Sequence, residues 1–117
     1  MKPGDIILTE FPKTNFSRGK LRPALVIALT PGRYEDALLA MISSKTHQFI
    51  VGFDVLIREN DPDFARTGLK STSVIRLSRL ATVEKRIIVA KLGEVDKNRL
   101  TVIYDRLINW MESLKKS

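Results

Sequence analysis

Short apolar runs separated by turn residues fill most of the chain up to about residue 95. Residues 5–11 are rich in β-branched side chains and follow a Pro-Gly pair, while residues 23–29 open on a proline and continue with six apolar residues. Runs of this length suit a strand and are too short for a typical helix. We therefore predict two strands here, paired antiparallel across the loop between them.

The later apolar runs are also predicted to be strands. Residues 37–42 consist of helix-favouring types, but the run is too short for a stable helix and lies among strands. In the run 71–78, alternation directs Ile75 and Leu77 to the core and Arg76 and Ser78 outward or into a groove. The remaining strand candidates are 49–51, 53–57, 80–83 and 87–92, the last ended by Gly93.

A helix is predicted from the N-cap residue Asp96 to about Leu114. Its apolar residues recur at helical spacing, and Trp110 and Met111 among them belong to the core or to an interface. Many short strands and one terminal helix predict a mainly β fold, a small β-barrel, closed or partly open, packed by that helix. The length of 117 residues suits one domain, residues 1–117.

The amino-acid composition excludes several kinds of chemistry for this chain. The chain has no cysteine, which excludes disulfide and thiolate chemistry, and its single histidine, His47, argues against a histidine-based zinc site. No metal or cofactor is expected. No apolar run approaches the roughly 20 residues that span a bilayer, and no apolar segment of a signal peptide follows Met1, so a cytoplasmic protein is expected.

The net charge of +7 is unevenly distributed. Between residues 66 and 91 seven basic residues face one acid, Glu84, whereas residues 54–63 are mainly acidic. A basic patch of this kind is the electrostatic footprint of a nucleic-acid binder. A solvated charged surface is the alternative.

Arg22 lies where a basic loop meets the second predicted strand, and Pro23 favours an extended backbone there. A guanidinium at this place can bind a phosphate bidentately. Taken alone, such an arginine is more often the partner of a nearby carboxylate in a surface ion pair. Ser43 and Ser44 follow the third predicted strand, where hydroxyl groups either bind a ligand or bond local backbone.

These residues suit a phosphodiester substrate. Neither common phosphate-binding glycine motif is present, and nothing places His47 beside a serine nucleophile. Cleavage of RNA needs little more than Arg22, the hydroxyl groups and Arg76, because the RNA supplies its own 2′-hydroxyl nucleophile. The protein must position the phosphate, neutralise its oxygens and move protons.

Three segments, GDIIL at 4–8, RPALVI at 22–27 and GLKSTSVIRL at 68–77, resemble the MazF/PemK (Kid) toxin family, and the similarity runs over nearly the whole chain. The resemblance implies an SH3-like barrel, shared with the CcdB gyrase inhibitors, and a homodimer that binds RNA in the groove between its subunits. It implies a metal-free endoribonuclease that cleaves single-stranded mRNA at short sequences and is neutralised by an antitoxin.

The resemblance also assigns residues. Arg22 would stabilise transition-state charge, Ser43 would hydrogen-bond the scissile phosphate, and Arg76 would act as an acid or a phosphate ligand. The residues expected to contact the rest of the substrate are polar or basic and lie near these three, namely Lys13, Arg18, Lys20, Ser44, Thr72 and Ser78.

Two positions depart from the family. Ser43 stands where many members have threonine, which retains the hydroxyl group. Ser78 stands where some members have a carboxylate, so a general base would have to lie elsewhere; His47 is one candidate, although a solvated loop histidine is the commoner reading. Two alternatives stay open: a protein-binding inhibitor on the same barrel, acting through the helix end after Trp110, and an RNA-binding module without full activity.

Overall fold

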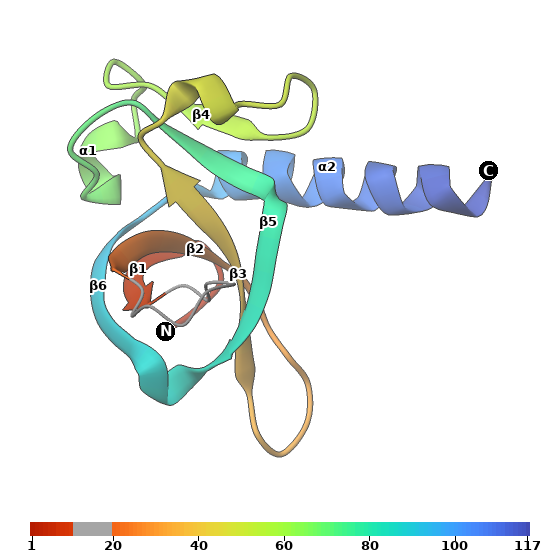
Figure 1. Cartoon of the computed structure of the whole chain (residues 1–117), viewed down its shortest axis with the longest axis horizontal. Helices are drawn as coiled ribbons and strands as arrows, with labels where there is room; N and C mark the ends of the chain where they lie inside the picture. Colours follow the sequence, from red (N-terminus) through yellow and green to blue (C-terminus); the bar gives the residue numbers. More distant parts are fainter. Residues whose placement is uncertain (11–19) are drawn as a thin grey trace.

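Six antiparallel strands form one sheet in the order β4-β5-β3-β2-β1-β6, and a long C-terminal helix lies beside it (Figure 1). The computed structural model describes residues 1–10 and 20–117. The sheet curls into a barrel-like shape but does not close, because β4 and β6 remain its edges. The predicted fold class is thereby confirmed. The elements are β1 (Asp5–Glu10), β2 (Leu21–Leu29), β3 (Asp36–Ser43), η1 (Thr46–Gln48), β4 (Val55–Ile57), α1 (Phe64–Thr67), β5 (Ser73–Glu84), η2 (Lys85–Ile87), β6 (Ile88–Glu94) and α2 (Lys97–Lys115).

The first three strands agree with the sequence pattern. β1 and β2 pair antiparallel, as predicted, with Ile6 opposite Leu25. β3 confirms that the run 37–42 is a strand despite its helix-favouring composition. One correction concerns β2, which begins at Leu21, so Arg22 lies inside the strand and pairs with Thr9 instead of ending a loop.

The boundaries of the strands after β3 differ more from those predicted from the sequence. The strand predicted at 49–51 is wrong, because residues 49 and 50 belong to no regular element and Val51 is exposed at the start of a turn. The runs 71–78 and 80–83 are not separate strands but parts of the single strand β5. β5 bulges between Arg76, opposite Met41, and Leu80, opposite Ala40. Gly93 lies within β6 and does not end it.

Apolar side chains fill both faces of the sheet, as period-two alternation requires. On one face Leu25, Ile42 and Ile75 pack with Ile103 of α2. On the other face Ala24, Val26 and Leu39 form a second cluster with Ile7 and Val83. The packing of this cluster fixes the position of the strands that carry further side chains on the same face.

α2 begins as predicted, because the Asp96 side chain accepts a hydrogen bond from the Arg99 backbone N–H at 2.8 Å. Ile103 is completely buried and contributes about 2 kcal/mol through burial. The Tyr104 hydroxyl donates to the Ile27 carbonyl oxygen at 2.7 Å. These contacts fix the first half of α2 on the sheet.

The second half of α2 extends away from the sheet (Figure 1). Trp110 packs edge-on against Phe53, with ring centroids 5.4 Å apart, yet it stays 42% exposed, and Met111 and Leu114 are also exposed. Of the two predicted roles for this stripe, core or interface, the exposure excludes a full core role. No helix among the described residues is long and apolar enough to cross a membrane.

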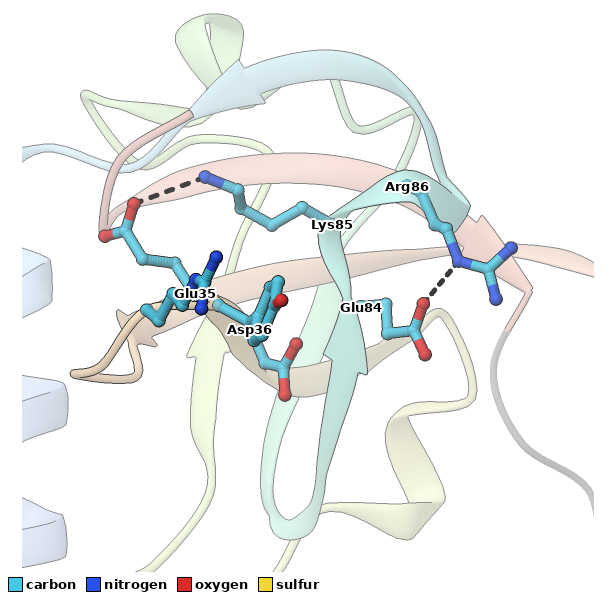
Figure 2. Close-up of a pocket in the computed structure, with 7 residues that line it drawn as sticks. Glu35, Asp36, Glu84, Lys85 and Arg86 are labelled. Atoms are coloured by element: carbon cyan, nitrogen blue, oxygen red, sulfur yellow. Dashed lines mark hydrogen bonds and ion pairs between the residues drawn. The ribbon is translucent and has the colours of Figure 1, made fainter.

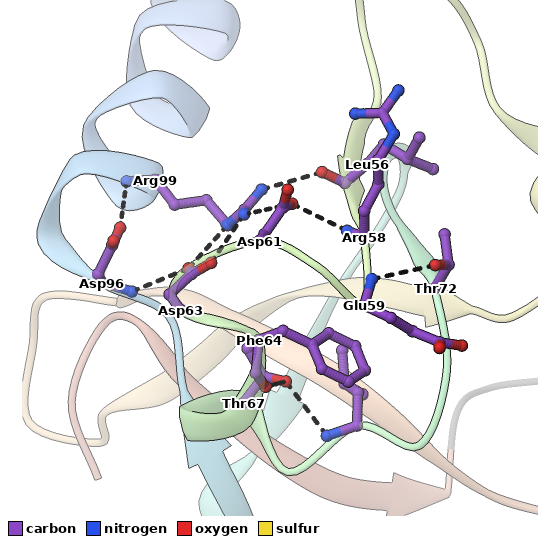
Figure 3. Close-up of polar contacts among 11 residues, drawn as sticks. Leu56, Arg58, Glu59, Asp61, Asp63, Phe64, Thr67, Thr72, Asp96 and Arg99 are labelled. Carbon is purple, nitrogen blue, oxygen red and sulfur yellow. Dashed lines mark hydrogen bonds and ion pairs between the residues drawn. The ribbon is translucent and has the colours of Figure 1, made fainter.

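A buried ion pair joins α2 to the segment between β4 and α1 (Figure 3). The Arg99 guanidinium donates to Asp63 from Nε at 2.9 Å and from Nη2 at 2.8 Å, and Nη2 also donates to Asp61 at 3.0 Å. The hydrogen bond from Arg99 lowers the pKa of the Asp63 carboxyl below its ordinary value, although burial opposes this. The acidic run seen in the sequence is thus part of the fold, because it anchors the helix.

Candidate nucleic-acid interface

The strand register brings the three predicted catalytic residues to the same end of the sheet. Ala24 of β2 is opposite Met41 of β3, and Met41 is opposite Arg76 of β5. Two residues further along the same strands lie Arg22 and Ser43. Because directly opposite residues and residues two apart share a face, Arg22, Ser43 and Arg76 lie on one face of three neighbouring strands. The second apolar cluster lies on this same face, and its member Ala24 is two residues from Arg22.

Arg22 is half-buried, and none of the ion pairs among the described residues includes it. Residues 11–19 contain no Asp or Glu. The simpler interpretation of Arg22, an ion pair with a neighbouring carboxylate, therefore does not hold. Lys20 is exposed next to the strand, while Lys13 and Arg18, two predicted substrate contacts, lie outside the described residues.

Ser43 is buried at the end of β3, and its Oγ accepts a hydrogen bond from the Lys45 backbone N–H at 3.1 Å. This is the bond to local backbone that the sequence offers as the alternative to ligand binding, and it fixes the position of the Ser43 oxygen. An oxygen that accepts one bond still carries a proton to donate. Ser43 can therefore donate to a phosphate oxygen without giving up its local bond. Ser44 is exposed.

Arg76 has a less usual environment. Its Nη1 donates to the Gln48 side-chain oxygen at 3.4 Å, and its buried Nε has no hydrogen-bond partner among the described residues. A buried donor without a partner costs free energy, and a catalytic role is one reason for a fold to retain such a group. Gln48 was not predicted from the sequence, because the residue lies in η1, far from Arg76 along the chain.

Ser78 and Thr72 are both engaged within the protein. The Ser78 hydroxyl and backbone N–H each donate to Asp54 Oδ1 at 3.2 Å. A carboxylate thus touches Ser78, although the sequence has none at position 78. The Thr72 hydroxyl oxygen accepts from the Glu59 backbone N–H at 3.2 Å (Figure 3). His47 is exposed in η1.

The basic stretch 66–91 is not one surface. Four of its seven basic residues are paired with acids: Arg66 with Glu94, Lys85 with Glu35, Arg86 with Glu84 and Lys91 with Asp5. The other three, Lys70, Arg76 and Arg79, belong to β5 or the segment before it and form no ion pair within the described part of the chain. Within the described residues of this stretch, the positive charge that can meet a polyanion is therefore that of Lys70, Arg76 and Arg79.

A cleft of about 630 Å³ lies near the start of β3, at the opposite end of that strand from Ser43 (Figure 2). Figure 2 shows that its charged side chains of both signs bond one another, Lys85 with Glu35 and Arg86 with Glu84. The third basic residue of the cleft, Arg33, stacks over the Tyr34 ring at 5.6 Å, so all three cations are engaged by neighbouring side chains. No three His, Cys, Asp or Glu side chains gather as a metal site among residues 1–10 and 20–117.

Comparison with known proteins identifies a family. No curated protein matches the sequence closely enough to count as a relative. The family described as PemK-like, MazF-like toxin of type II toxin-antitoxin system matches residues 2–111, nearly the whole of the 117-residue chain. The chain therefore belongs to the family of PemK-like, MazF-like toxins of type II toxin–antitoxin systems, a membership that implies a cognate antitoxin as its partner.

Proposed function

We propose that this toxin is an endoribonuclease that cleaves single-stranded mRNA in the cytoplasm at short sequences, by attack of the RNA's own 2′-hydroxyl on the adjacent phosphodiester. The observation that carries the proposal is the placement of Arg22, Ser43 and Arg76 on one face of neighbouring strands, with neither arginine in an ion pair among the described residues. Family membership supports it.

In the proposed reaction the 2′-oxygen forms a bond to phosphorus while the bond from phosphorus to the 5′-oxygen breaks. The 2′-hydroxyl loses a proton and the departing 5′-oxygen gains one, which leaves a 2′,3′-cyclic phosphate and a 5′-hydroxyl. Negative charge grows on the non-bridging oxygens. Arg22 and Arg76 donate to these oxygens, and the Ser43 hydroxyl holds the phosphate in register.

Substrate contacts beyond the scissile phosphate are proposed for Lys20 and Ser44, which are exposed beside Arg22 and Ser43. Lys13 and Arg18 would add contacts from the segment outside the described residues. We further propose that two copies of the chain form a homodimer with RNA in the groove between them. All of these would be ionic or hydrogen-bonding contacts to the RNA backbone. Such contacts position an RNA strand but do not recognise its bases.

The test is a cleavage assay on a long single-stranded RNA in EDTA, comparing wild type with Arg22→Ala and with a matched control, Arg33→Ala. Arg33 is exposed on the turn between β2 and β3, far along the strands from Ser43. Loss of one charge-stabilising donor costs about a hundredfold or more in kcat, so Arg22→Ala should lose nearly all cleavage. Arg33→Ala should cleave like wild type.

Two results would refute the proposal. One is RNA of varied sequence left intact by wild-type protein that is folded. The other is an Arg22→Ala variant as active as Arg33→Ala.

A second candidate function, inhibition by protein binding, is favoured by the exposed apolar end of α2. Trp110, Phe53 and Leu80 line an apolar cleft of about 620 Å³ there. A gyrase-inhibitor-like toxin would stop DNA supercoiling by gyrase equally well with or without Arg22. Supercoiling assays with wild type and Arg22→Ala distinguish it from the nuclease, which leaves supercoiling unaffected.

A further inference from the structure

Asp54 is a buried carboxylate that the proposed reaction does not use. Its side chain is completely shielded from solvent, directly before β4. Among the described residues no Lys, Arg or His forms an ion pair with its side chain, although the Arg106 guanidinium donates to its backbone carbonyl oxygen. Burying a charge without a cation is costly, so the hydrogen bonds made by this carboxylate must matter to the fold or to the site.

Those hydrogen bonds link two segments. Asp54 Oδ1 accepts from the backbone N–H and hydroxyl of Ser78, both at 3.2 Å, while Oδ2 accepts from the Ile50 backbone N–H at 3.0 Å. Ser78 lies two residues beyond Arg76, and Ile50 lies two residues beyond Gln48. Arg76 and Gln48 in turn bond each other through Nη1 and Oε1 at 3.4 Å. One carboxylate therefore joins the two backbone segments whose side chains meet at the Arg76 guanidinium.

The geometry also explains why a carboxylate is needed at this place. Between Arg76 and Leu80, β5 bulges away from β3, so Ser78 has no partner in that ladder. Asp54 lies next to Val55, which pairs with Ile75, so its position is adjacent to Arg76 across the β4–β5 ladder. The carboxylate takes the place of the missing backbone acceptor and fixes how β5 bends just after Arg76.

We propose that Asp54 is the positioning residue for Arg76: by bridging Ser78 and Ile50 it holds the Arg76 guanidinium and the Gln48 amide in the geometry that meets the phosphate. This inference rests on the proposed function of the same site. Asp54 does not act as the general base, because it is shielded from solvent and its oxygens already accept hydrogen bonds from three donors.

The experiment compares single-turnover cleavage by wild type, Asp54→Ala, Asp54→Asn and Ser78→Ala. Misplacement of a reacting group by about 1 Å costs roughly a hundredfold, so Asp54→Ala should lower kcat about a hundredfold and leave KM within about threefold. Asn can satisfy Ser78 or Ile50 but not both, so Asp54→Asn should lose about tenfold with an unchanged pH–rate profile. Ser78→Ala keeps the backbone bond to Asp54 and loses only the hydroxyl bond, so its loss of kcat should be smaller than that of Asp54→Ala.

Arg99→Ala is the control for lost stability, since it breaks a buried ion pair that includes neither Asp54 nor Ser78. If Asp54 served only the general stability of the fold, Arg99→Ala would lower kcat as much as Asp54→Ala at equal loss of stability. A second readout is independent of activity. The Arg76 Nε–H is buried, so its NMR signal should exchange slowly with water in wild type and Arg99→Ala, and at least tenfold faster in Asp54→Ala and Asp54→Asn.

The outcomes separate this proposal from the function on which it rests. If wild type cleaves no RNA, the nuclease proposal fails, and the exchange of the Arg76 Nε–H still decides whether Asp54 positions that group. If wild type cleaves but Asp54→Asn keeps full kcat and slow exchange, the positioning role is wrong even where Asp54→Ala fails to fold. Loss of the acidic limb of the pH–rate profile in Asp54→Asn would instead make Asp54 the general base and overturn the proposal.

Discussion

Replacement of Arg99 by alanine should destabilise the fold strongly, because it removes the cation of a nearly buried ion pair. The Arg99 side chain is 15% exposed and that of Asp63 only 4% exposed. The guanidinium makes two bonds to Asp63, one to Asp61 and one to the Leu56 carbonyl oxygen (Figure 3). In Arg99→Ala the Asp63 carboxylate keeps one long bond, from the Asp96 backbone N–H at 3.4 Å.

The size of the expected loss in the free energy of unfolding follows from these contacts. Removal of one partner of a buried ion pair costs about 3–5 kcal/mol. Asp61 is 24% exposed and can turn to water, so the lower end, about 3 kcal/mol, is expected. For a chain of this length that corresponds to a fall in Tm of about 12 °C.

Thermal unfolding followed by circular dichroism at pH 7 measures this change, with Lys85→Ala as the control. Lys85 pairs with Glu35 at 3.4 Å, but both side chains are about half exposed, so the control should lose less than about 1 kcal/mol. A Tm for Arg99→Ala within about 3 °C of the control would refute the reasoning.

The pH dependence provides a second check on the same pair. Since the hydrogen bond from Arg99 lowers the pKa of Asp63, the stability from this pair is fully present above the ordinary carboxyl pKa and is lost as pH falls through the lowered value. Arg99→Ala lacks this contribution. The difference in stability between wild type and variant should therefore shrink below about pH 4, and a constant difference down to pH 2 would contradict the assignment.

Three further predictions concern other parts of the molecule. Gly93→Ala should lower Tm sharply or prevent folding, because the added Cβ would overlap the Arg66 carbonyl oxygen; a Tm like that of wild type would contradict the close approach of β6 and α1. Tyr104→Phe should cost about 1 kcal/mol in urea unfolding through loss of the bond to Ile27, and an unchanged midpoint would show that this bond contributes nothing. Binding of a non-cleavable RNA analogue should weaken with salt, and Lys20→Ala should reduce the slope of log K against log salt by about 0.7, whereas an unchanged slope would remove Lys20 from the interface.

The fold was largely predictable from local pattern, because strands and helix each have their own period of apolar residues. The failures have a local cause as well. Ile50 and Val51 look like strand residues but are exposed, and the Ile50 backbone N–H donates to the side chain of Asp54, four residues further on, instead of to a neighbouring strand. β5 was divided in two because Arg79 interrupts its apolar pattern, although the strand continues through Leu80.

The site was predictable only in part. Arg22, Ser43 and Arg76 were assigned through family resemblance, and the register then gave a physical reason for grouping them. Gln48 and Asp54 were not predicted, because their contacts with Arg76 and Ser78 span 28 and 24 residues. A single sequence has no local signal for contacts of that range.

The central claim is that the RNA's own 2′-hydroxyl is the nucleophile, and that Arg22, Ser43 and Arg76 position and neutralise the phosphate that it attacks, without a metal. The most direct measurement uses an RNA with one cleaved site, prepared with and without a single 2′-deoxy substitution there, and incubated with the toxin in EDTA. We predict that the all-RNA strand is cut to a 2′,3′-cyclic phosphate and a 5′-hydroxyl, while the substituted strand stays intact at that site. Cleavage of the substituted strand, or products that carry a 5′-phosphate, would contradict the account.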